Sequence, residues 1–185
     1  TFLENMYKLL GCYWLNDYFS TQRAELKLHQ LEMAKRVGLR VPRTLVTSNL
    51  DELLLFADVC RNNVAIKGLG RQHISDGEKK LFLYTSRLDL RDRKALERIK
   101  YAPHFFQEMV QKKYELRITV VGEELFAAEI ASQDVGVAQV DWRRASGLVK
   151  YRAHNLNTTV SKAILSLMKE LQLDYGAVDM IVTPN

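Results

Sequence analysis

Residues 114–131 read YELRITVVGEELFAAEIA and carry the clearest structural pattern in the chain. Apolar side chains occupy every second position over 116–120, which places them on one face of a strand. Gly122-Glu123 then supplies a turn before a second apolar run at 125–131. This stretch predicts the beginning of a large antiparallel sheet.

Helical and extended patterns alternate irregularly on either side of this stretch. Apolar residues at helical spacing predict a helix over 21–37, which Gly38 ends, and an amphipathic helix over 158–171. The other expected elements are helices over 51–59 and 92–99, strands over 44–47, 64–67, 105–110 and 177–182, and a loop-rich segment at 132–150. Asn49 is expected to cap the helix that begins at Asp51. Because strands and helices do not alternate regularly, we predict an α+β fold rather than a doubly wound parallel sheet.

A glycine-containing segment follows the strand expected at 64–67. Gly68 and Gly77 bracket it, and a further strand is expected at 80–84, so the two strands resemble a hairpin whose long flexible tip would cover a ligand. Lys67 ends the first strand and opens onto this loop, a placement from which an ammonium group reaches phosphates.

Composition favours a soluble cytoplasmic protein with an anionic partner. The 185 residues are 47% hydrophobic and carry a net charge of +5, which suits a nucleotide or an acidic peptide, although a solvated surface explains the charge equally well. No basic stripe interleaved with aromatic residues indicates nucleic-acid binding, and no run of eighteen apolar residues indicates a membrane span. Cys12 and Cys60 lie far apart and are expected to be reduced thiols.

Several kinds of site are excluded by the motifs that the sequence lacks. It has neither a P-loop nor a dinucleotide-binding fingerprint. Its histidines have no metal-ligand spacing, and no serine or cysteine lies in a nucleophile motif. Covalent hydrolase chemistry is therefore not expected.

Two charged side chains share the polar face of the strand at 114–121. Glu115 and Arg117 are two residues apart and therefore point to the same side. On the strand alone, a surface ion pair between them, worth at most about 1 kcal/mol, is the favoured explanation over a binding site.

Asp179 interrupts the run Gly-Ala-Val-Asp-Met-Ile-Val, which is apolar enough to be buried. A buried carboxylate without a partner is heavily penalised, so we expect something to compensate its charge. Mg²⁺ is commonly held by one or two carboxylates together with nucleotide phosphates. A structural salt bridge to a lysine or arginine is the alternative, and the segment alone leaves both open.

Six segments, taken in order, resemble the ATP-grasp superfamily. They are ELKLHQL at 25–31, GLRVPRT at 38–44, AIK at 65–67, FQEMV at 106–110, YELR at 114–117 and AVD at 177–179. Within the superfamily, YELRITVVG at 114–122, AEI at 128–130 and DWRR at 141–144 are similar to the graspetide maturases of the microviridin and marinostatin type.

The resemblance implies two α+β lobes with ATP between them. It places a remnant of an N-terminal domain at 1–20, the central lobe at 21–108 and an incomplete C-terminal lobe at 109–185. The implied activity is an ATP-dependent ligase that activates Asp or Glu side chains of a ribosomal precursor peptide as acyl phosphates and closes lactone or lactam rings.

The resemblance also implies roles for individual residues. Two lysines would hold the phosphates, a hinge would read adenine, one carboxylate would bind ribose, another would bind Mg²⁺, and arginines would face the phosphates or the acyl phosphate. In that order the residues are Lys27 and Lys67; Gln107, Glu108, Met109 and Val110; Glu115; Asp179; and Arg117 with Arg143 or Arg144.

The chain also departs from the superfamily pattern. A Glu-x-Asn metal motif is expected on the strand after Asp179, and the domain expected before Trp14 is largely missing, so we expect a chain truncated at both ends. The expected partners are a precursor peptide with a leader and an acidic core, and a second copy in a homodimer. Two rivals remain: an amino-acid ligase of the glutamate type, and a nucleotide- or peptide-binding module without activity.

Overall fold

The computed structural model describes residues 2–70, 73–76 and 79–184, and the chain forms two compact units. Unit 1 contains Thr1–Val41, Leu116–Glu129 and Tyr151–Met180, and unit 2 contains Pro42–Glu115, Ile130–Lys150 and Ile181–Asn185. Neither unit is therefore made from one continuous stretch of sequence. The lobe boundaries inferred from the resemblance stay predictions.

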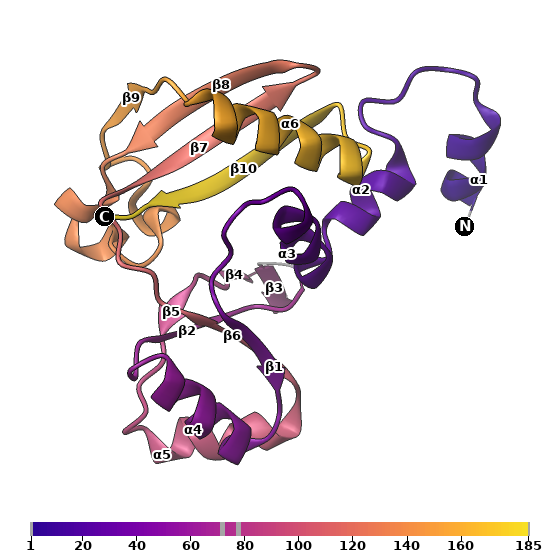
Figure 1. Cartoon of the computed structure of the whole chain (residues 1–185). Coiled ribbons are helices and arrows are strands. Elements are labelled where there is room, and N and C mark those ends of the chain that lie inside the picture. Colours follow the sequence, from indigo (N-terminus) through magenta and orange to yellow (C-terminus); the bar gives the residue numbers. More distant parts are fainter. Residues whose placement is uncertain (1, 71–72, 77–78, 185) are drawn as a thin grey trace. The chain divides into compact units, whose positions relative to one another are not determined.

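Unit 2 is built on a four-stranded antiparallel sheet with two helices beside it (Figure 1). In the sheet order β1-β6-β2-β5 the strands are Thr44–Thr47, His104–Glu108, Val64–Lys67 and Ser86–Arg87, and the helices are α4 (Leu50–Val59) and α5 (Arg93–Glu97), which continues into the 3-10 turn η1 (Arg98–Tyr101). Leu53, Val64 and Phe106 form the fully buried centre of its core. The Asn49 side chain caps α4 by accepting the N–H of Asp51, as the sequence predicts.

The expected hairpin between 64–67 and 80–84 is wrong. Strand β2 pairs with β5, where Ala65 lies opposite Arg87, whereas β3 (His73–Asp76) pairs with β4 (Lys79–Phe82) in a sheet of their own. Alternation of apolar and polar residues predicts a strand but does not predict which strand it pairs with. The connection from β3 to β4 is short, and closing a short loop costs less conformational entropy than closing a longer one. Gly77, one of the bracketing glycines, lies outside the described residues.

The segment at 132–150 is loop-rich, as expected, and contains three short 3-10 turns. These are η2 (Ser132–Asp134), η3 (Gly136–Ala138) and η4 (Trp142–Ala145). A small apolar cluster supports them, formed by the buried residues Ile130, Ala138, Ala145 and Val149.

Unit 1 is built on a second sheet, along which helix α6 lies (Figure 1). The strands, in the order β10-β7-β8-β9, are Tyr175–Val182, Tyr114–Val121, Glu124–Ile130 and Tyr151–Ala153, and the helices are α1 (Phe2–Leu9), α2 (Tyr18–Ala24), α3 (Lys27–Arg36) and α6 (Thr158–Leu171). Leu116, Ile118 and Val120 are buried, which confirms the alternation read from the sequence. Two mixed units with separate sheets confirm the α+β class.

The single helix expected at 21–37 is wrong, because the chain breaks between α2 and α3. Leu26 has an extended backbone, with ψ of 104°, and the Gln30 side chain donates to the last carbonyl of α2. A side chain therefore replaces a helical N–H partner at the break, which apolar spacing does not reveal. Gly38 ends α3 with a φ of +85°, as expected of a glycine stop. None of the described helices is long and apolar enough to cross a membrane.

Candidate functional site

Lys67 is held in unit 2 by a hydrogen-bonded chain that crosses three strands. Strand β6 lies between β1 and β2, so Gln107 has Thr44 on one side and Ala65 on the other. The Gln107 side chain is buried; its Oε1 accepts from Lys67 Nζ at 2.7 Å, and its Nε2 donates to Thr44 Oγ1 at 3.0 Å. The ammonium group at the end of β2 is therefore fixed from within the sheet.

The hinge after β6 uses part of its backbone within the unit. The N–H of Glu108 donates to the Arg43 carbonyl and that of Met109 donates to the Asn63 carbonyl, both at 2.9 Å. Those two N–H groups are therefore engaged. If this segment binds adenine, as the resemblance implies, the backbone groups that would do so are the N–H of Val110 and the carbonyl groups of the segment.

Glu115, at the beginning of β7, is buried and paired with Lys112. Lys112 Nζ lies 3.0 Å from Glu115 Oε1 and donates to the Val140 carbonyl at 2.8 Å, and both charged side chains are 10% exposed. The sequence did not identify Lys112 as a partner of Glu115. The two residues are three positions apart, a spacing that brings side chains together on a helix but not at the beginning of a strand. The alternative of an ion pair between Glu115 and Arg117 is wrong, since each has another partner.

Arg117 pairs with Asp179 on the neighbouring strand of unit 1. Arg117 Nη1 donates to Asp179 Oδ1 at 2.9 Å, and the side chains are 39% and 30% exposed. The expectation that Asp179 is buried is wrong, because β10 is the edge strand of its sheet in the described chain and alternate residues face outward. The salt bridge that the sequence left open is present, and it keeps a cation and a carboxylate together at an accessible position.

Lys27 is the first residue of α3 in unit 1 and is only partly exposed. Burial lowers the pKa of its ammonium group below the usual value. The N-terminus of a helix carries partial positive charge, so a cation is unfavourable there. Both effects disfavour the charged lysine, and a bound anion would offset both.

Arg143 and Arg144 have different environments, although they are adjacent in η4. Arg143 Nη1 lies 3.2 Å from Asp141 Oδ1, and its guanidinium lies 5.2 Å from the centre of the Trp142 ring. The exposed Arg144 instead donates to Ser86 Oγ at 2.8 Å. Arg143 is therefore paired with a buried carboxylate, whereas Arg144 is exposed and is held by Ser86, by the Thr85 carbonyl and by the Tyr84 ring, whose centre lies 5.3 Å from its guanidinium.

Asp141 is a buried carboxylate that the sequence did not single out for a role of its own. Its Oδ2 accepts the N–H of Thr85 at 3.0 Å, and its Oδ1 accepts the N–H of Arg143 at 3.2 Å. Burial of the carboxyl acts to raise its pKa, but the Thr85 N–H and the charge of Arg143 outweigh burial, so the pKa lies below its usual value. Asp141 thus fastens the loop-rich segment to the beginning of β5.

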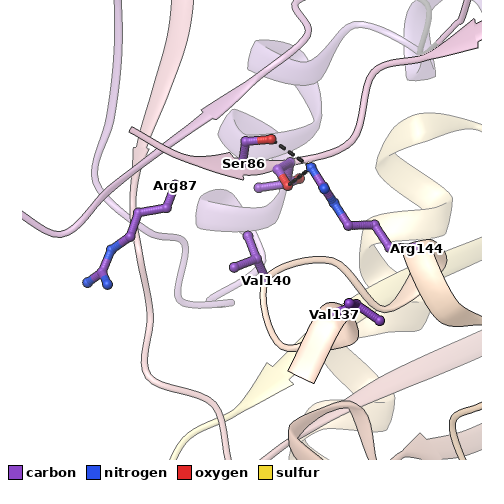
Figure 2. A pocket seen from close by; sticks show the side chains of 6 residues that line it. Ser86, Arg87, Val137, Val140 and Arg144 are labelled. Carbon is purple, nitrogen blue, oxygen red and sulfur yellow. Dashed lines mark hydrogen bonds between the residues drawn. The ribbon is translucent and has the colours of Figure 1, made fainter. Parts of the chain in front are cut away.

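A pocket of about 190 Å³ opens beside Arg144 (Figure 2). Hydroxyl and guanidinium groups line one part of it and valine side chains another, the residues being Thr85, Ser86, Arg87, Val137, Val140 and Arg144. Figure 2 shows the Arg144 side chain pointing toward Ser86. Figure 2 shows the Arg87 side chain pointing away from Arg144, and its guanidinium donates to Asn63. The Arg144 guanidinium is therefore the cation that suits an anionic group such as a carboxylate here.

A third buried carboxylate, Glu129 on β8, pairs with Arg152 on β9 in unit 1. It accepts a hydrogen bond from Arg152, and His154 Nδ1 lies 3.6 Å from its Oε2. The hydrogen bond from Arg152 is the main cause that lowers the pKa of Glu129. Among residues 2–70, 73–76 and 79–184 no group of three histidine, cysteine or acidic side chains is placed to hold a metal ion.

Comparison with known proteins relates this arrangement to solved enzymes. No family sequence model and no curated protein matches the chain. A RiPP-associated ATP-grasp ligase of Chryseobacterium gregarium, solved with ADP and a leader and core peptide, is 32% identical, with a TM-score of 0.90 over 99% of this chain and 55% of that one. The chain belongs to the ATP-grasp superfamily.

A second similar protein was also solved with a peptide bound. The macrocyclase MdnC of Microcystis aeruginosa, solved with the precursor peptide MdnA, is 35% identical, with a TM-score of 0.84 over 98% of this chain and 57% of that one. The chain therefore spans just over half the length of these relatives. The D-Ala:D-Ser ligase VanG of Enterococcus faecalis matches at 16% identity and a TM-score of 0.63 over 98% of this chain and 55% of that one, a likeness of ATP-grasp fold alone.

Proposed function

We propose that the chain is the nucleotide-binding body of an ATP-dependent ligase that closes side-chain rings in a ribosomal precursor peptide. The observation that carries the proposal is identity of 32% and 35%, over nearly the whole chain, with two ATP-grasp proteins solved with peptides. The expected partners are a peptide with a leader and an acidic core, which the net charge of +5 suits, and a second copy in a homodimer. The expected compartment is the cytoplasm.

The proposed reaction has two steps. A carboxylate oxygen of a substrate Asp or Glu attacks the γ phosphorus of ATP, the bond to the β,γ-bridging oxygen breaks, and ADP leaves. The hydroxyl of Ser or Thr, or the amine of Lys, then attacks the acyl carbon and releases phosphate. The product is a lactone or lactam that has lost one water. Catalysis rests on positioning and on neutralising phosphate charge.

The described residues fit a nucleotide with its metal ion. Lys67, fixed by Gln107, and Lys27, destabilised as a cation at a helix N-terminus, are assigned to the phosphates, and Glu115 to the ribose. Asp179 offers one carboxylate for Mg²⁺, which suffices where phosphates supply further ligands, and Arg117 beside it is assigned to the phosphates or the acyl group. Mg²⁺ would neutralise charge on the phosphates as the γ phosphate is transferred.

Of the two adjacent arginines, we assign Arg144 to the substrate acyl group. It lines the pocket, whereas Arg143 is committed to Asp141 and Trp142. The exposed Arg144 guanidinium beside Ser86 is placed to donate hydrogen bonds to a carboxylate without breaking a buried ion pair.

Intact-mass analysis tests the proposed function. Candidate acidic precursor peptides would be incubated with the full-length protein, ATP and Mg²⁺, and we expect a loss of about 18 Da for each ring closed. Asp179→Ala should abolish the loss. A gain of residue masses would instead establish an amino-acid ligase, and unchanged peptides with ADP or ATP bound would establish a binding module.

Replacing Lys27 should weaken nucleotide binding. Lys27→Met should weaken ADP binding about tenfold, because a charge-assisted hydrogen bond to a phosphate is lost. Calorimetric titration with ADP measures the affinity.

Lys35 in the last turn of the same helix provides the matched control. A cation is favourable at that end, so Lys35→Met should lower stability slightly and leave the ADP affinity unchanged. Equal effects of the two substitutions on ADP binding would contradict the assignment of Lys27.

A further inference from the structure

Lys112 lies in the connection between β6 and β7, where its ammonium group is almost fully enclosed. The side chain is 10% exposed, and its Nζ donates to Glu115 Oε1 at 3.0 Å and to the Val140 carbonyl at 2.8 Å. Removing two opposite charges from water is unfavourable unless further hydrogen bonds satisfy them. The Val140 carbonyl supplies one such bond, so the pair depends on the loop-rich segment that contains Val140.

The contact leaves the Glu115 carboxylate oriented but not saturated. Lys112 engages Oε1, and Oε2 has no protein partner within the described part of the chain. A carboxylate with one oxygen fixed presents the other in a set direction, as an acceptor for a hydroxyl group requires. The geometry suits the ribose role proposed for Glu115.

The same ammonium group also touches the wall of the pocket. Val140 lines that pocket together with Arg144, and Figure 2 shows both side chains at its edge. Trp142 lies two residues beyond Val140 and packs against the cluster around Ile130. A displacement of Val140 would therefore change the surroundings of Trp142, whose ring lies beside the Arg143 guanidinium.

We infer that Lys112 is a positioning residue that fixes Glu115 for a nucleotide ribose and couples occupancy of that site to the pocket wall at Val140. The inference rests on the proposed function, because it needs a nucleotide at Glu115. Coupling of this kind is reciprocal, so a ligand in the pocket would also tighten nucleotide binding. In this role Lys112 acts on the nucleotide through Glu115 and on the pocket through Val140.

Titration with ADP and Mg²⁺, followed by calorimetry and by tryptophan emission, tests the inference. We expect ADP to change the emission of Trp142, which Trp142→Phe identifies by removing the change. Lys112→Met should weaken ADP binding about tenfold and abolish the emission change even at saturating ADP. Lys112→Arg should restore both, and the exposed neighbour substitution Lys113→Met should alter neither.

The outcomes distinguish the inference from the proposed function. Weaker binding in Glu115→Gln with unchanged binding in Lys112→Met would leave the proposed function standing and overturn the inference. An intact emission change in Lys112→Met, or none in the unsubstituted protein, would overturn the coupling. Absence of any ADP binding by the unsubstituted protein would overturn both. If Lys112→Met does not fold, absence of an emission change in the unsubstituted protein still overturns the coupling, and weak ADP binding by Lys112→Arg overturns the positioning role.

Discussion

Lys67→Met should reduce ring closure by at least about a hundredfold while leaving the protein folded. The ammonium group is fixed by buried Gln107, which in turn is fixed by Thr44, so its position costs no reorganisation when charge develops on a phosphate. Methionine keeps much of the side-chain length and removes the charge. The rate of mass loss from a precursor peptide under saturating ATP measures the effect.

Two further substitutions make this expectation specific. Lys94→Met removes an exposed cation from α5 in the same unit and should leave the rate unchanged. Gln107→Met should have an intermediate effect, because Lys67 keeps its charge but loses an anchor. A rate for Lys67→Met within twofold of the unsubstituted protein would remove Lys67 from the mechanism.

Asp141→Asn should cost about 3 kcal/mol of unfolding free energy, because it leaves buried donors facing a neutral side chain. The carboxylate is 5% exposed and accepts from the Thr85 N–H and from Arg143. An amide brings its own N–H₂ donor to a site already filled with donors. Denaturation with urea at neutral pH measures the loss.

The pH dependence of this loss provides an internal check. Because the folded-state pKa of Asp141 lies below the ordinary value of 3.8, its contribution to stability is complete above pH 3.8 and is lost as pH falls through the folded-state pKa. The stability difference between Asp141→Asn and the unsubstituted protein should therefore shrink below pH 3.8. Asp134→Asn, an exposed control, should change stability little at any pH, and an equal loss there would contradict the buried role of Asp141.

Local periodicity and capping predicted much of the fold. The amphipathic helix at 158–171 matches α6 residue for residue, and the strand at 114–121 matches β7. Asn49 caps α4 as expected, because an N-cap acts on N–H groups only two and three residues away. In each case the deciding interaction lies within a few residues of the signal.

The errors share a different physical origin. The hairpin prediction failed because strand pairing depends on competing partners, and the helix break at Leu26 depends on a side chain four residues away. Asp179 lies on an edge strand, which composition cannot distinguish from a central one.

In the candidate site, too, the residues could be named from the sequence, whereas the contacts that hold them could not. The resemblance named Lys67 and Glu115, but their supporting contacts join residues far apart in sequence, such as Lys67 with Gln107 and Lys112 with Val140. The residue roles inferred from the resemblance stay predictions until substitutions test them.

Segments of the two units alternate along the sequence. Strand β7 begins in unit 2 and continues in unit 1, and β10 crosses in the opposite direction near Met180. A cut between β6 and β7 would leave both four-stranded sheets complete, but it would separate residues 1–41 from the rest of unit 1 and residues 130–150 from the rest of unit 2. We therefore expect one calorimetric transition on heating rather than two. We also expect that neither unit can be expressed alone as one continuous stretch of the chain.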